Sequence, residues 1–354
     1  VFMLVAIARL YSEFGTTELP LLIDHKFSFS LELWIWLGFF MAMSVKIPMW
    51  PFHTWLPYAH VEAPTAGSVI LAGILLKLGG YGFARIVIPM LPDASTYFAP
   101  LVMTLSIISI FYTSLVALVQ NDIKKLIAYS SVAHMGFVTL GLFSLKPEGV
   151  KGATLLMLGH GVISAGLFFM VGMLYDRFHT RDIKSYGGLH KIFPIMAALF
   201  LTFSFSSIAV PGTGSFIGEF MVLYSTFRSN TLFATLALSG LVFGAAYMLW
   251  LYQRLFNGTL FVPDQSIDFS VSLAEHVEKT SNQPFLTENV NFETKSIMTK
   301  FSHKGIADLN YLERFILMPL LIVIFVMGIY PIFFTNIISK VAKDKILIHH
   351  IHDN

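Results

Sequence analysis

The chain has 354 residues, of which 55% are hydrophobic and only 12% are charged, and its formal net charge is +2. Soluble domains carry about 25% charged residues, so this composition excludes an ordinary soluble domain and indicates a polytopic membrane protein. The small net charge argues against a nucleic-acid partner, and the absence of cysteine excludes disulfides, thiolate catalysis and iron–sulfur ligation by this chain.

The first long apolar segment, residues 30–55, is interrupted by Lys46, Pro48 and Pro51. It follows residues 1–10, which are apolar but too short to cross a hydrocarbon core of about 30 Å. Proline removes a backbone donor and clashes with the preceding turn of a helix. We therefore predict a discontinuous helix here, which at membrane depth has to be buried in protein or line a hydrated cavity.

Further apolar runs predict spans over residues 66–89, 95–119, 121–143, 152–175, 230–256 and 315–337. The run 192–227 is too long for one straight helix, and a Pro-Gly-Thr-Gly sequence at 211–214 interrupts it. Discontinuous helices in corresponding positions of two halves are typical of inverted-repeat transporters. The sequence therefore predicts an all-α polytopic membrane bundle with two discontinuous transmembrane helices, forming a single membrane domain over residues 1–354.

Basic residues in short loops indicate the orientation of a membrane protein. One side carries Lys124, Lys125, Arg177, Arg181, Lys184 and Lys191, and the other carries Lys26, Lys146, Lys151 and Arg228. This bias predicts that 121–125, 177–191 and the polar connection 257–314 lie on the matrix or cytoplasmic side. The connection has no apolar run long enough to re-enter the bilayer, so we expect it to be extramembrane.

Two lysines, Lys46 and Lys77, lie deep in apolar sequence. A lysine at the bilayer centre costs about 3 kcal/mol or more, so it is retained where it has a partner, water or a function. Lys46 could instead be a lysine at a helix end whose amine reaches the interface. The apolar stretch that precedes it favours the other interpretation, in which both lysines belong to a charge pathway inside the membrane.

Three further titratable residues lie on predicted spans. Glu219 follows the second interruption, where a helix N-terminus would favour an acid, so it fits both an interfacial and a functional residue. His134 and His160 each stand alone on an apolar helix, where histidine is more often a packing residue. Imidazole nevertheless titrates near neutral pH and suits a proton relay. No predicted helix carries two histidines at i, i+4 spacing, so we expect no metal site.

Three segments carry a resemblance to a known family: KIPMWPFHTWLPYAHVEAPTAGSVILAGILLKLGGYG, NDIKKLIAYSSVAHMGF and PGTGSFIGEF. In this order they resemble the chain 4 family of antiporter-like subunits of NADH:ubiquinone oxidoreductase, respiratory complex I. The resemblance covers residues 30–256. Chains 2 and 5 of that complex and the Mrp-type cation/proton antiporter subunits share the lysines more loosely.

The resemblance implies a proton-translocating subunit of the membrane arm, in which Lys46 is the lysine of a glutamate–lysine pair and Lys77 is the central lysine. It places His134 and His160 along a hydrated axis and makes Glu219 the acid on the second broken helix. It implies no cofactor in this chain, because NADH, FMN, the Fe–S clusters and ubiquinone belong to other subunits.

The family has fourteen spans, and its paired glutamate lies on a helix that would precede Val1. We therefore expect this chain to be the C-terminal part of such a subunit, with the N-terminal helices on a separate chain or an upstream segment. The expected partners are other membrane-arm subunits, including neighbouring antiporter-like chains, and membrane lipids. The expected location is the mitochondrial inner membrane, with a bacterial plasma membrane as the alternative.

Two other functions stay open from the sequence. One is an Mrp-type antiporter subunit, which is a secondary transporter rather than a redox-driven pump. The other is a scaffold subunit that does not pump. Neighbouring chains distinguish the first from a complex I subunit, because co-purification with flavin and Fe–S subunits indicates complex I. A separate chain that carries the helix with the missing glutamate would count against the scaffold function.

Overall fold

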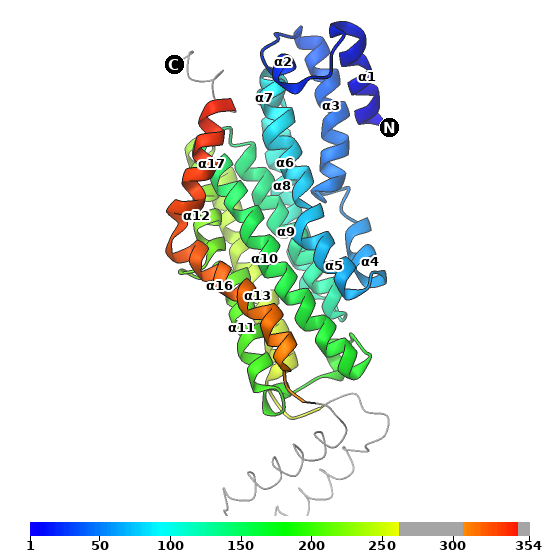
Figure 1. Cartoon of the computed structure of the whole chain (residues 1–354), viewed down its shortest axis with the longest axis vertical. Coiled ribbons are helices and arrows are strands. Elements are labelled where there is room, and N and C mark those ends of the chain that lie inside the picture. Colours follow the sequence, from blue (N-terminus) through cyan, green and yellow to red (C-terminus); the bar gives the residue numbers. More distant parts are fainter. Residues whose placement is uncertain (262–306, 346–354) are drawn as a thin grey trace, which may run out of the picture.

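The structure is a computed structural model that describes residues 1–261 and 307–345. It is an elongated helical bundle, and no β-sheet forms within those ranges (Figure 1). Six described helices are long and apolar enough to cross a membrane. The predicted all-α polytopic membrane bundle is confirmed, whereas most of the 257–314 connection lies outside the described residues.

The first half of the chain forms α1 (Phe2–Phe14), α2 (Leu19–Ile23), α3 (Phe29–Lys46), α4 (Trp55–Glu62), α5 (Thr65–Ile70), η1 (Leu71–Leu75), α6 (Lys77–Gly82), η2 (Phe83–Val87), α7 (Ile88–Met90), α8 (Pro92–Leu118) and α9 (Ile123–Leu142). The second half forms α10 (Pro147–Phe178), η3 (Ile183–Ser185), η4 (Leu189–Lys191), α11 (Pro194–Ser207), α12 (Gly214–Ser229), α13 (Thr231–Phe256), α16 (Tyr311–Ile329) and α17 (Pro331–Lys345). Helix α10 is the most buried of the candidate spans and packs against α9, α11, α12 and α16.

Both predicted helix interruptions are present. Helix α3 ends at Lys46 and α4 begins at Trp55, with both interrupting prolines in the connection. Helix α11 ends at Ser207 and α12 begins at Gly214. In the second connection Gly212 has a φ of +97°, a conformation that glycine adopts without the steric cost of a side chain. The interruptions therefore arise from the proline and glycine residues that the sequence places there.

The span that carries Lys77 differs from the straight helix predicted over 66–89. Two π-helical turns, η1 and η2, flank α6, and such turns often occur at functional sites. The glycines of α6 allow close packing here: a Cβ on Gly79 would lie 2.6 Å from the Ile47 amide nitrogen. The end of the first broken helix thus packs directly against the segment that follows Lys77.

The last predicted span, 315–337, has different bounds in the structure. Helix α16 begins earlier because Asn310 and Glu313 form a capping box at its N-terminus. It ends at Ile329 because Tyr330 leaves helical geometry and Pro331, which lacks an amide hydrogen, starts α17. The apolar run is therefore two helices rather than one.

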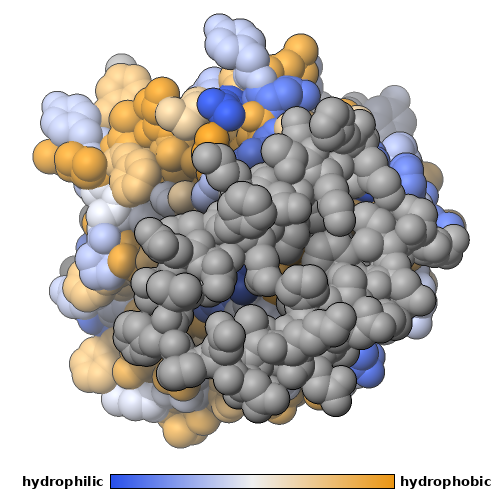
Figure 2. Space-filling view, turned by 90° about the horizontal axis from the view of Figure 1, so that it is seen from below, coloured by the Kyte–Doolittle hydropathy of each residue, from blue (hydrophilic) through white to orange (hydrophobic). Residues whose placement is uncertain are grey.

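Loops 121–125 and 177–191 meet at one end of the bundle, and the side of the membrane that this end faces stays a prediction. The Ile123 amide donates to the Arg181 carbonyl at 3.0 Å, and Gly187 and Phe261 form an isolated bridge. Hydrophobic and hydrophilic side chains both border this end in the view from below (Figure 2).

The flanks of the bundle expose large apolar residues such as Ile74 and Val242, as expected of surfaces that contact lipid.

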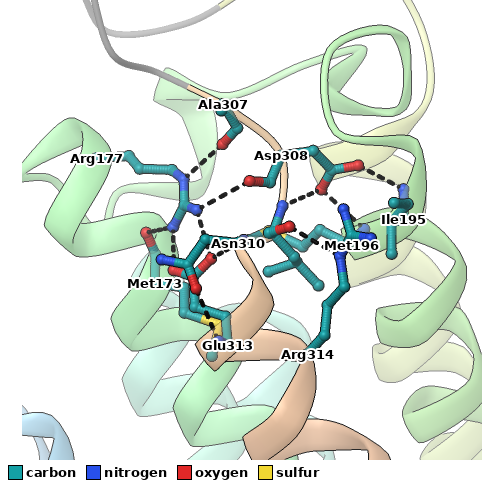
Figure 3. A network of polar contacts seen from close by, with 10 residues as sticks. Met173, Arg177, Ile195, Met196, Ala307, Asp308, Asn310, Glu313 and Arg314 are labelled. Carbon is teal, nitrogen blue, oxygen red and sulfur yellow. Dashed lines mark hydrogen bonds and ion pairs between the residues drawn. The ribbon is translucent and has the colours of Figure 1, made fainter.

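A polar network at this end fixes α16 to α10 (Figure 3). The Arg177 guanidinium donates to both carboxylate oxygens of Glu313 at 2.8 Å, and it also donates to the carbonyls of Met173 and Ala307. Such two-pronged pairing of arginine with a carboxylate is among the stronger polar contacts in proteins.

The same network reaches the second broken helix. The Asp308 carboxylate accepts hydrogen bonds from the amides of Ile195 and Met196 in the first turn of α11, at 2.8 and 3.2 Å. An acid at this position satisfies free amides and complements the helix dipole. A residue far along the chain therefore caps the helix that leads to the second interruption.

Candidate functional site

Lys77 and His160 form the first contact of the candidate site. The Lys77 amine donates to the Ala72 carbonyl in η1 and lies 2.8 Å from Nδ1 of His160 on α10. His160 is 5% exposed, so this contact is inside the bundle. The direction of the hydrogen bond to Ala72 shows that the lysine side chain turns back towards the start of its own span.

The close approach of η1 and α10 depends on glycine. A Cβ on Gly161 would lie 2.8 Å from the Gly73 carbonyl oxygen and 3.5 Å from Cε of Lys77. Cβ atoms are essentially never found that close to a backbone oxygen, so a larger residue would push the two segments apart. The glycine that follows His160 therefore allows the lysine amine to reach the imidazole.

His134 extends the contact to the second broken helix. Its ring centroid lies 5.4 Å from that of His160, and its Nδ1 lies 3.2 Å from Oε1 of Glu219 on α12. Its Nε2 lies 3.2 Å from the Ser207 hydroxyl at the end of α11. A neutral ring donates from one nitrogen and accepts at the other, whereas a protonated ring donates from both.

Glu219 closes the row and borders a small cavity. The residue is 2% exposed, and its Oε2 has no hydrogen-bond partner among the described residues. A cavity of about 10 Å³ lies beside it, lined among others by Ser207 and Tyr247. That volume is close to the space of one water molecule, and polar side chains border it.

Four of the five predicted site residues therefore form one continuous row in the order Lys77, His160, His134 and Glu219. Each neighbouring pair is a direct polar contact or a pair of adjacent rings. Ser207 and Tyr247 also border this row. The sequence does not single them out, because hydroxyl residues are common on apolar helices. The row thus brings four titratable groups together inside the bundle, with polar contacts at both ends and two adjacent rings in the middle.

Lys46 lies apart from the row. Its side chain is exposed and lines a groove of about 610 Å³ whose other walls are apolar, including Phe2, Met43 and Trp55. Among the side chains that the structure describes, in 1–261 and 307–338, no carboxylate lies within 4.0 Å of its amine. Its predicted role in a glutamate–lysine pair stays a prediction.

Comparison with known proteins gives the family. The family described as NADH:quinone oxidoreductase/Mrp antiporter, TM, matches residues 1–244. The chain belongs to this transmembrane family. It is 48% identical over 330 residues to the NADH-ubiquinone oxidoreductase chain 4 of Marchantia polymorpha, covering 93% of this chain and 59% of that protein. It is 41% identical to the NADH-quinone oxidoreductase subunit M of Rhodobacter capsulatus, covering 99% of this chain and 64% of that protein.

Two solved structures have a similar fold. A chain of respiratory complex I from Thermus thermophilus with bound NADH matches with a TM-score of 0.80 and 29% identity, over 97% of this chain and 65% of that chain. A chain of the Mrp complex from Dietzia sp. DQ12-45-1b matches with a TM-score of 0.79 and 17% identity, over 98% and 65%, which shows a shared fold. The resemblance seen in the sequence is confirmed, and this chain spans about three fifths of the length of its curated relatives.

Gly161→Ala tests whether glycine sets the spacing between Lys77 and His160. The added methyl group meets the Gly73 carbonyl, and overpacking of this kind costs about 1–3 kcal/mol, so we expect a lower melting temperature in detergent. Gly159→Ala on the same helix is the matched control, because its Cβ would meet nothing closer than 3.4 Å. Equal melting temperatures for the two variants would contradict the close-approach argument.

Proposed function

We propose that this chain translocates protons in the membrane arm of a NADH:ubiquinone oxidoreductase. The observation that carries the proposal is the row of neighbouring titratable side chains from Lys77 to Glu219 through the interior of the bundle. The identity to chain 4 and subunit M proteins supports this assignment, since those relatives are named as subunits of NADH oxidoreductases.

The proposed mechanism is proton transfer without a covalent intermediate. The Lys77 amine gives a proton to the neighbouring His160 nitrogen, and the proton passes to His134, directly or through water, and then to Glu219. Each transfer lowers the charge of the donor by one unit and raises that of the acceptor by one unit, and thereby alters the proton affinity of the next group. Glu219 releases its proton on the side of the second helix interruption, and Lys77 is then reloaded.

Under this proposal the driving reaction lies elsewhere in the assembly. The chain holds no redox cofactor, and NADH, FMN, Fe–S clusters and ubiquinone bind to other subunits. Its partners are the other membrane-arm subunits, including neighbouring antiporter-like chains, and lipids. The assembly resides in the mitochondrial inner membrane, with a bacterial plasma membrane as the alternative.

An Mrp-type cation/proton antiporter subunit is the second candidate. The likeness to the Mrp complex favours it, but that likeness rests on 17% identity, compared with 48% to a chain 4 protein. Purification of the native assembly decides between them, because flavin and Fe–S subunits accompany a complex I subunit and are absent from an antiporter.

Lys77→Ala tests the proposed function. The variant should assemble normally and lower proton-coupled quinone reduction severalfold, because the row loses the group that loads His160. Lys26→Ala removes a lysine from the exposed surface and is the matched control, with expected activity equal to the parent. Normal pumping by a fully assembled Lys77→Ala complex would contradict the proposal.

The environment of Lys46 leads to a separate prediction. A charged amine in an apolar groove at membrane depth costs about 3 kcal/mol or more unless a partner neutralises it. We expect a glutamate from another polypeptide, or from a segment before Val1, to lie within a salt bridge or one water molecule of the Lys46 amine. An experimental structure of the assembled complex checks this, and an amine that faces only lipid or pairs with an acid of this chain would contradict it.

A further inference from the structure

Arg254, in the last turn of α13, carries a guanidinium whose donors lack acceptors. Its Nε and Nη2 atoms are buried and have no hydrogen-bond partner among the residues that the structure describes. The group lies over the Trp250 indole, with 4.6 Å between the guanidinium carbon and the ring centroid. This stack holds the guanidinium but leaves the N–H groups in its plane unsatisfied. An acceptor from outside the chain would satisfy them, and a guanidinium matches the oxygens of a carboxylate or a phosphate best.

Arg254 ends an exposed ridge of apolar side chains on α13. Residues four apart lie on one face of a helix, and Leu238, Val242, Ala246 and Trp250 precede Arg254 at this spacing. All four are exposed; Val242 is 68% exposed and Trp250 is 46% exposed. An apolar ridge that ends in tryptophan and then arginine is typical of a helix face that passes from acyl chains to lipid headgroups.

The length of α13 places Arg254 at the depth of the headgroups. The helix has 26 residues and is therefore about 39 Å long, whereas the hydrocarbon core of a bilayer is about 30 Å thick. Both ends of a helix centred in that core reach the headgroup region. At the end that carries Arg254, the Gly188 amide donates to the Asn257 carbonyl, so this is the basic end of the bundle, where loop 177–191 lies.

Exposed basic residues lie around this end of α13. The short helices η3 and η4 pack against α13 and carry Lys184, His190 and Lys191, all exposed. Nδ1 of His190 donates to the last carbonyl of α13. Asp182 precedes η3, and its Oδ1 accepts a hydrogen bond from the Lys184 amide at 3.1 Å. Arg254 and the two lysines outnumber this acid, which favours an anionic ligand over a zwitterionic one.

We propose that Arg254 and Trp250 form a binding site for an anionic phospholipid at the basic end of the bundle. The guanidinium donates to the phosphate oxygens, Lys184 and Lys191 add electrostatic attraction, and the acyl chains lie along the ridge that begins at Leu238. The site is on the exposed face of α13, whereas the row is buried, and it does not depend on the proposed proton translocation. A carboxylate of another subunit is the competing acceptor and would exclude lipid from this site.

The test places the assembled complex in vesicles of phosphatidylcholine mixed with phosphatidylglycerol, which carries a photoactivatable group on one acyl chain. Mass spectrometry then maps the crosslinks. We expect labelling of α13 between Leu238 and Trp250, reduced severalfold in Arg254→Gln and intermediate in Arg254→Lys, which keeps the charge but loses the planar fork. Photoactivatable phosphatidylcholine should label the same segment severalfold less.

Arg228→Gln is the matched control. It removes an exposed arginine from the last turn of α12, which adjoins the opposite end of α13, and should leave the labelling of α13 as in the parent. Because Arg254→Gln could fail to assemble, Lys184→Gln combined with Lys191→Gln provides a second variant. Both lysines are exposed, and their loss should lower the labelling as well.

Equal labelling of α13 in the parent and in Arg254→Gln would overturn the inference. Equal labelling by the two lipids would overturn it too, because the charge of the headgroup would then have no effect. An experimental structure in which a carboxylate of another subunit pairs with Arg254 would also contradict it. Lost labelling in an Arg254→Gln complex that still translocates protons would support the site, and impaired Lys77→Ala translocation is a separate result that concerns the proposed function alone.

Discussion

The contact between Lys77 and His160 is the interaction on which the rest of the site depends. A lysine inside a membrane bundle needs polar partners, and here the Ala72 carbonyl and the His160 imidazole supply them. Neither partner neutralises the amine as a carboxylate would. The lysine is therefore held in place without a carboxylate that would fix its charge, which is what the proposed role of Lys77 as the loading group requires.

Several features of the fold keep this contact in position. The π-helical turn before Lys77 and the glycine after His160 bring their two segments together. The second interruption places Ser207 and Glu219 on either side of His134, because α11 ends and α12 begins near the middle of the bundle. The Asp308 cap and the pair between Arg177 and Glu313 then fix α11 and α16 at the basic end (Figure 3).

The sequence predicted the helical fold and both interruptions, because proline and glycine act on the backbone locally. It also singled out Lys77, His160, His134 and Glu219, which the structure brings together, since ionisable groups stand out in apolar helices. It named Lys46 as well, which lies apart from them, and their functional roles stay predictions. It did not predict that Lys77, His160, His134 and Glu219 touch in that order, because packing between distant helices decides it. The π-helical turns and the helix end before Pro331 were missed for a related reason: hydropathy reports burial and is insensitive to a local change of backbone hydrogen bonding.

The central claim is that protons pass along the row through His134, which contacts Glu219 and also adjoins His160. The most direct measurement is the number of protons translocated per quinone reduced in vesicles that contain the assembled complex with His134→Leu. The account predicts a lower ratio than in the parent complex, because leucine cannot carry a proton between the two neighbours. An unchanged ratio in a fully assembled variant would contradict it.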